Sequence, residues 1–101
     1  MEKIKVIGIE NLTLEEKDIL NKLAEEYREK IELTLKNKTS LSVHIKLHSP
    51  TGKRKEYEIT VKTISTAKTF ESSSNEWKFH PALHKAFQKI EHEIEHYYRD
   101  K

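Results

Sequence analysis

The spacing of the apolar residues switches from a helical repeat to a strand repeat and back, and this switch limits the folds available to the chain. Apolar side chains recur every three or four positions in residues 13–35 and again in residues 83–99, as in amphipathic α-helices. Between them, residues 41–48 and 57–61 alternate apolar and polar side chains, as in strands with one buried face. Two helices and a hairpin therefore each have one apolar side to bury.

Local signals mark where the first helix starts and add two more strands. Residues 4–9 form a β-branched run that ends near Gly8, which predicts a first strand. Thr13, followed three residues later by Glu16, has the pattern of a capping box at the start of the first helix. Residues 69–73 predict a short fourth strand with a weaker signal, because they are rich in serine and threonine.

The expected order is β-α-β-β-β-α, which predicts an α+β fold. A four-stranded mixed sheet with both helices packed on one face would bury all of the apolar sides, as in double-stranded RNA-binding domains (dsRBD-like). We expect residues 1–101 to form a single domain, with residues 61–70 as a long connection. The other face of the sheet would meet water and form a second, weaker basic surface. Its expected members are Lys5, His44, Lys46, His48, Thr60 and Lys62.

The composition excludes several kinds of site. Cysteine is absent and there are only two glycines among 101 residues, which excludes disulfide scaffolds, thiolate zinc sites, cysteine nucleophiles and glycine-rich phosphate loops. No nucleophile elbow or paired-acid pattern is present, so we expect no catalytic residues, cofactor or small-molecule substrate. The N-terminal apolar stretch is interrupted by charges, and no apolar run approaches the ~20 residues of a membrane span. We therefore expect a cytoplasmic protein without a membrane partner.

The last predicted helix separates its side chains into two faces. At about 100° per residue, its apolar side chains fall within one arc of roughly 100°. The opposite side forms what we call the basic ridge: Lys85, Lys89, His92, His96 and Arg99. Steps of four, three, four and three residues stack these side chains along one line, and no carboxylate of the helix falls in that line. Such a ridge suits a polyanion such as RNA, although charged side chains also cover ordinary solvated helices.

Charge is distributed unevenly along the chain. Residues 13–35 carry seven acidic and four basic side chains, a net charge of −3, which leaves +5 on the rest of a chain whose total is +2. The tip of the predicted hairpin adds three consecutive basic residues. These are Lys53, Arg54 and Lys55. We expect a bipolar molecule in which this turn and the basic ridge are the sites for RNA.

Several local patterns resemble a known family. The first strand ends at Gly8, residues 12–14 read Leu-Thr-Leu before the first helix, and residues 79–83 read Phe-His-Pro-Ala-Leu at the start of the last helix. The pattern continues at Lys85, Phe87, Lys89, Ile90 and Ile94. Over almost its whole length the chain resembles the ribosome hibernation-promoting factors and ribosome-associated inhibitors, also called sigma-54 modulation proteins. The likeness is to a short form, because the chain stops directly after the last helix.

The resemblance implies a non-enzymatic protein that binds rRNA of the small ribosomal subunit, in the channel used by mRNA and tRNA, and inhibits translation during dormancy or stress. By position, the family's RNA contacts carry over to Lys85, Lys89 and Arg99, with His92 and His96 as hydrogen-bond donors. We expect a monomer off the ribosome. One departure stands out, because family members are generally basic on the first helix. Here its exposed face is expected to carry Asp18, Glu25, Glu29 and Glu32.

Other functions stay open. Autonomous binding of double-stranded RNA is one, but residues 80–84 read His-Pro-Ala-Leu-His and lack the basic start of the second helix that those domains use. A protein-interaction module that pairs through the hairpin or a sheet edge is another. His92 and His96 have helical metal-ligand spacing, but no third ligand is evident, so we expect no metal site. Trp77 would either cover the core or form a stacking platform for a base.

Overall fold

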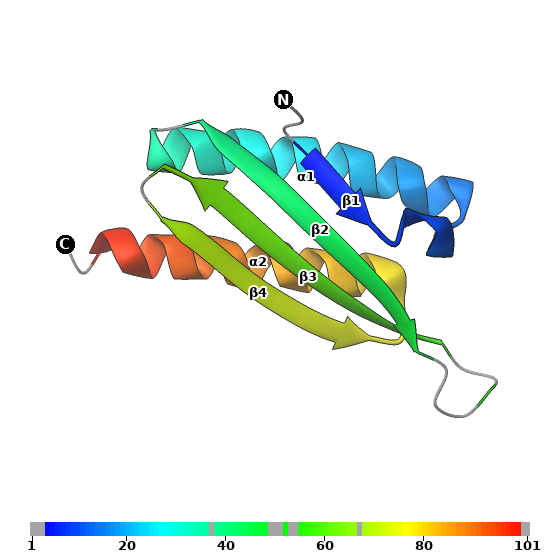
Figure 1. Ribbon diagram of the computed structural model, residues 1–101. Coiled ribbons are helices and arrows are strands. Elements are labelled where there is room, and N and C mark those ends of the chain that lie inside the picture. Colours follow the sequence, from blue (N-terminus) through cyan, green and yellow to red (C-terminus); the bar gives the residue numbers. More distant parts are fainter. Residues whose placement is uncertain (1–3, 37, 49–51, 53–54, 67, 100–101) are drawn as a thin grey trace.

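The computed structural model describes residues 4–36, 38–48, 52, 55–66 and 68–99, apart from the side chain of Arg99. Its elements confirm the predicted order and fold class (Figure 1). They are β1 (Ile4–Ile7), a 3-10 helix (Ile9–Asn11), α1 (Leu14–Leu35), β2 (Thr39–His48), β3 (Glu56–Ser65), β4 (Thr69–Glu76) and α2 (Phe79–Arg99). Neither described helix has the length and apolar character needed to span a bilayer.

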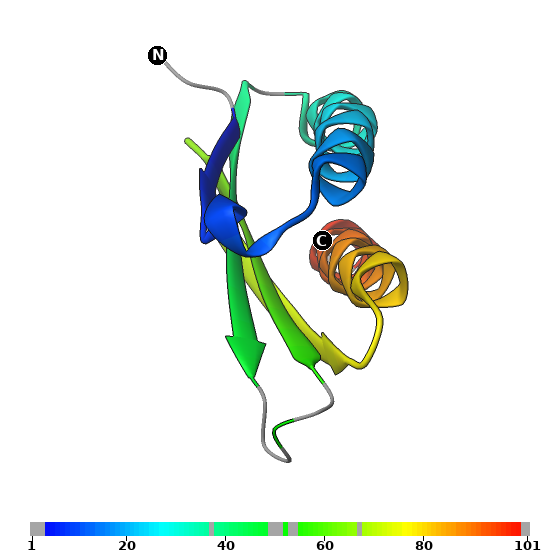
Figure 2. The same cartoon turned by 90° about the vertical axis from the view of Figure 1, so that its right-hand side faces the viewer.

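The four strands form one mixed sheet in the order β1-β2-β3-β4. β1 runs parallel to β2, and the other neighbours are antiparallel. Both helices lie on the same side of this sheet (Figure 2). β1 stops at Ile7, two residues earlier than predicted, because Gly8 has a left-handed φ of 88° that turns the chain into the 3-10 helix.

The core fills the space between the helices and the sheet. α2 contributes its apolar face, on which Phe87 and Ile90 are fully buried, and β2 and β3 contribute every second residue. The ring of Tyr27 in α1 stacks on the ring of Phe87 in α2, with centroids 4.5 Å apart and an interplanar angle of 4°. This stack joins the two helices to each other as well as to the sheet.

The capping box at the start of α1 is confirmed. The backbone N–H of Glu16 donates to the Thr13 hydroxyl at 3.1 Å, and the backbone N–H of Thr13 donates to the Glu16 carboxylate at 2.9 Å. The phenol of Tyr57 in β3 also donates to Glu16, at 3.1 Å. Burial raises the pKa of this phenol, and the neighbouring Glu16 carboxylate raises it further. One carboxylate therefore caps the helix and ties it to the sheet.

The predicted long connection before β4 is wrong, because β3 continues to Ser65 and a tight turn follows. The Ser65 hydroxyl donates to the Lys68 carbonyl at 2.8 Å and accepts from the Lys68 N–H at 3.2 Å. The apolar alternation did not show the end of this strand, because the inward position there is the buried Thr63 and the outward one is the exposed Ile64. The turn places Lys68 directly at the start of β4.

β4 is also longer than predicted, and its serines pack against α2. The Ser72 hydroxyl donates to the carbonyl of Ala86 at 2.8 Å, and the Ser74 hydroxyl donates to the carbonyl of Ala82. Small side chains on both elements let the helix backbone approach the strand closely. The strand was predicted to end at residue 73, but it continues to Glu76, and Ser72 and Ser74 form part of the surface on which α2 docks.

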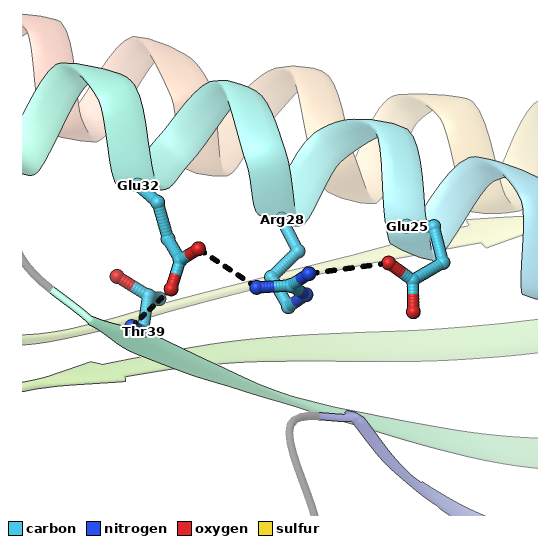
Figure 3. A network of polar contacts seen from close by, with 4 residues as sticks. All are labelled: Glu25, Arg28, Glu32 and Thr39. Carbon is cyan, nitrogen blue, oxygen red and sulfur yellow. Dashed lines mark hydrogen bonds and ion pairs between the residues drawn. The ribbon is translucent and has the colours of Figure 1, made fainter.

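A polar network links α1 to the start of β2 (Figure 3). Arg28 is only 7% exposed, and its guanidinium donates to Glu32 at 2.8 Å and to Glu25 at 3.3 Å. The second carboxylate oxygen of Glu32 accepts the backbone N–H of Thr39, the first residue of β2, at 2.9 Å. Glu32 therefore compensates a buried charge and satisfies a strand donor at the same time.

Gly8 offers the sharpest stability test in this fold. A Cβ at Gly8 would lie 2.1 Å from the carbonyl oxygen of Ile45, whereas a Cβ at Gly52, which has a similar positive φ, would meet nothing within 4 Å. We expect Gly8→Ala to lower the free energy of unfolding by about 3 kcal/mol, and Gly52→Ala by about 1 kcal/mol from backbone strain alone. Urea unfolding monitored by circular dichroism measures both, and equal costs would contradict the close approach at Gly8.

Glu32 offers a second test, with Glu29 as the matched control on the same helix. Glu32→Ala removes an acceptor from the buried Arg28 and from the Thr39 N–H, so we expect a loss of about 2 kcal/mol. Glu29 is exposed, and its replacement by alanine should cost less than about 0.5 kcal/mol. Urea unfolding of both variants gives the comparison. A Glu32→Ala protein as stable as Glu29→Ala would show that the network contributes nothing.

Candidate nucleic-acid interface

The docking of α2 turns four members of the basic ridge to the surface. Lys85, Lys89, His92 and His96 are all exposed, while the opposite side of the helix is buried against the sheet and α1. Arg99 is the last residue of α2 and continues the line by position. From Lys85 to His96 the ridge runs roughly 16 Å along the helix axis, at about 1.5 Å per residue.

Lys85 is paired with a carboxylate that the helix pattern does not contain. Its ammonium contacts the Oε1 atom of Glu76, the last residue of β4. The Glu76 side chain is 26% exposed and that of Lys85 is 58% exposed. The expectation of a ridge uninterrupted by acid therefore holds within α2, but β4 supplies an acid to the first lysine.

Lys89 also contacts β4, but through an uncharged acceptor. Its ammonium donates to the backbone carbonyl of Ser73 at 2.8 Å. Because a carbonyl carries no net charge, this bond orients the lysine without cancelling its charge. The two lysines of the ridge thus have different electrostatic surroundings although they are one helical turn apart.

Shallow grooves run between the ridge and β4. One is lined by Asn75 and Glu76 from β4 and by residues of α2, namely Lys85, Gln88, Lys89 and His92. A second lies toward the end of α2, where His96 and Tyr97 face the start of β4, and two acids, Glu71 and Glu93, also line it. The ridge is therefore one wall of a surface that α2 and β4 form together.

Lys68 extends this surface and was missed by the sequence analysis. Its ammonium lies 4.4 Å from the ring centroid of Tyr97 and 5.3 Å from that of Phe70, and the residue lines the same groove as His96. A long connection was expected here, so no position could be given to Lys68. Recognition of a tight turn at residues 65–68 would have placed it beside the ridge.

The basic turn can be compared with the structure only in part. Lys53 and Arg54 lie outside the described residues, so their place relative to the ridge stays a prediction. Lys55 is exposed and directly precedes β3, whose residue Tyr57 pairs with Glu76 at the end of β4. Lys55 is thus at the end of the sheet where α2 begins.

The open face of the sheet is not the basic surface that was expected. Lys5, Lys46 and Lys62 are exposed there, but the antiparallel register of β2, β3 and β4 places acidic residues beside Lys46 and Lys62. Lys5 pairs with Ser42 of β2. Glu58 pairs with Lys46 and Glu71 pairs with Lys62 across the strands, Glu56 pairs with His48, and the His48 ring is 3.6 Å from Glu58. His44 and Thr60 occupy the same face. The charges on this face are mixed because the earlier expectation omitted the acidic residues of β3 and β4.

α1 has an acidic outer side, as expected, but only three of the four acids expected there are exposed. Asp18, Glu25 and Glu29 are exposed, whereas Glu32 is half-buried in the network with Arg28. Trp77, which follows β4, is 43% exposed, and its role as a cover over the core or as a stacking platform stays a prediction. Among the described residues no group of three potential metal ligands is present.

These features define a small α+β protein with a line of exposed basic side chains on α2, beside β4. A family model described as sigma 54 modulation protein / S30EA ribosomal protein matches residues 9–101. The chain therefore belongs to this family of ribosome-associated factors, as the local patterns around residues 12–14 and 79–83 suggested. No curated protein and no solved structure matches the chain.

Proposed function

We propose that this protein binds rRNA of the small ribosomal subunit through the basic ridge and inhibits translation during dormancy or stress. The observation that carries the proposal is the exposure of Lys85, Lys89, His92 and His96 along one side of a helix whose other side is buried in the core. Membership of a ribosome-associated family supports it. The protein acts by binding, as a cytoplasmic monomer when off the ribosome, and carries out no chemistry.

The ridge suits the phosphate backbone of RNA. Lysine ammonium groups on a rigid helix offer charges at fixed spacing, which allows recognition of phosphates and shape without reading base edges. Lys89 is held by the Ser73 carbonyl and keeps its full charge, so it is the strongest single contact in the described part of the ridge. Arg99 and Lys55 add contacts, and Lys53 and Arg54 are further contacts expected from the sequence.

Charge also determines the orientation on RNA. The exposed acids of α1, Asp18, Glu25 and Glu29, would be repelled by phosphates. The ridge therefore faces the rRNA while the outer side of α1 faces away from it. Contact is limited to α2, β4 and the hairpin, which reconciles an acidic α1 with ribosome binding.

Three neutralising substitutions test the proposal. Lys85→Gln, Lys89→Gln and Arg99→Gln are combined, because glutamate at position 85 would meet Glu76. At about 1 kcal/mol per lost phosphate contact, the variant should bind small subunits on the order of 100-fold more weakly. Sedimentation of purified protein with small subunits through sucrose gradients, over a range of salt concentrations, measures this loss.

The control changes the net charge equally at other places. Lys22, Lys38 and Lys46 are exposed on α1, before β2 and on the open sheet face, and their replacement by glutamine should leave co-sedimentation nearly unchanged. Wild-type binding should weaken steeply as salt rises. A ridge variant that co-sediments like the wild type would refute the ridge as the binding surface, and binding that salt does not affect would favour an apolar protein interface.

A further inference from the structure

Glu76 differs from the other acids near α2 because it contacts a ridge lysine directly. It lies on β4, where its backbone pairs with Tyr57 of β3, so the strand holds its carboxylate beside α2. The side chain is 26% exposed, less than half of the 58% exposure of Lys85. Lys85 is the more exposed partner, and Glu76 is the more enclosed one.

A carboxylate and an RNA phosphate are alternative partners for the same ammonium. Both are anionic oxygen acceptors, and Lys85 cannot give its full charge to a phosphate while Glu76 keeps the contact. Even a phosphate that approaches without breaking the pair meets the repulsion of the carboxylate. Lys89 has no such cost, because its acceptor is the neutral carbonyl of Ser73.

We propose that Glu76 is an intramolecular competitor for the phosphate that Lys85 would bind, and that it sets a threshold for the affinity of the ridge for RNA. This inference rests on the proposed function, in which the ridge binds RNA. A short or flexible RNA that offers few other contacts binds weakly while Glu76 holds Lys85. A rigid rRNA surface that engages the whole ridge can displace the carboxylate.

The test is a comparison of Glu76→Gln with Glu29→Gln, which changes the net charge equally on the exposed side of α1. The probe is a fluorescent oligouridine of about 12 nucleotides, whose binding is followed by anisotropy at several salt concentrations. Glu76→Gln should bind it about 2- to 5-fold more tightly. The salt slope should steepen by about 0.7, as expected for one added phosphate contact to a single strand. Glu29→Gln should change the affinity less than about twofold.

A second pair of variants shows whether the effect passes through Lys85. In a Lys85→Gln background, Glu76→Gln should raise the affinity for oligouridine no more than Glu29→Gln does, because no ammonium at position 85 is left for Glu76 to hold. Lys85→Gln alone should also weaken binding less than Lys89→Gln, since only Lys89 offers an uncancelled charge. This last comparison leaves Glu76 unchanged, so it can be made even if Glu76→Gln does not fold.

The outcomes separate this inference from the proposed function. A Glu76→Gln gain no larger than that of Glu29→Gln, or one that persists without Lys85, would overturn the role of Glu76 while RNA binding by the wild type stands. The same holds if Lys85→Gln weakens binding as much as Lys89→Gln. A wild-type protein that binds neither oligouridine nor small subunits would overturn the proposed function, and this inference with it.

Discussion

The stacking of Tyr27 on Phe87 is the contact on which the arrangement of the two helices depends. Phe87 is fully buried, and its ring lies almost parallel to that of Tyr27 at 4.5 Å. Burial of this ring sets the rotation of α2 about its own axis, since a turned helix would expose Phe87 and bury charge. Because an α-helix is rigid, fixing one side fixes the other. The direction of the basic ridge therefore follows from the packing of an aromatic pair.

β4 also holds α2 in place. Hydroxyl groups of Ser72 and Ser74 donate to α2 carbonyls, and the small side chains let strand and helix meet closely. The same strand then supplies the partners of the two ridge lysines, the Ser73 carbonyl and the Glu76 carboxylate. The candidate interface is thus made by α2 and β4 together. A helix with the same sequence on another support would present different electrostatics.

Much of the fold was predictable because it depends on local signals. The period of the apolar residues identified both helices and the hairpin, and the Thr13 capping box located the start of α1. β4 was harder to predict, since Phe70 is its only buried apolar side chain and the next inward side chains are Ser72 and Ser74, which allow close approach of α2. The burial of Arg28 was not predicted, because it depends on the tertiary packing around α1. Its ion-pair partners Glu25 and Glu32 lie three and four residues away on the same helix, so the sequence shows the partners but not the burial.

The candidate site was predictable to a similar degree. The exposure of Lys85 and Lys89 follows from the sidedness of α2 alone. Lys68 and Glu76 could not be placed, because their proximity to the ridge depends on the register of β4 and on the tight turn before it. The mixed charge of the open sheet face depends on strand register in the same way. Lys53 and Arg54 stay predictions.

The central claim, that the ridge side of α2 faces rRNA and the outer side of α1 does not, can be tested by photocrosslinking on the ribosome. A photoreactive amino acid is placed at Gln88, which lines the groove beside Lys85 and Lys89, or at Glu29, which is exposed on α1. The account predicts crosslinks to small-subunit rRNA from position 88 and none from position 29. Crosslinks to rRNA from position 29 with none from position 88 would contradict it.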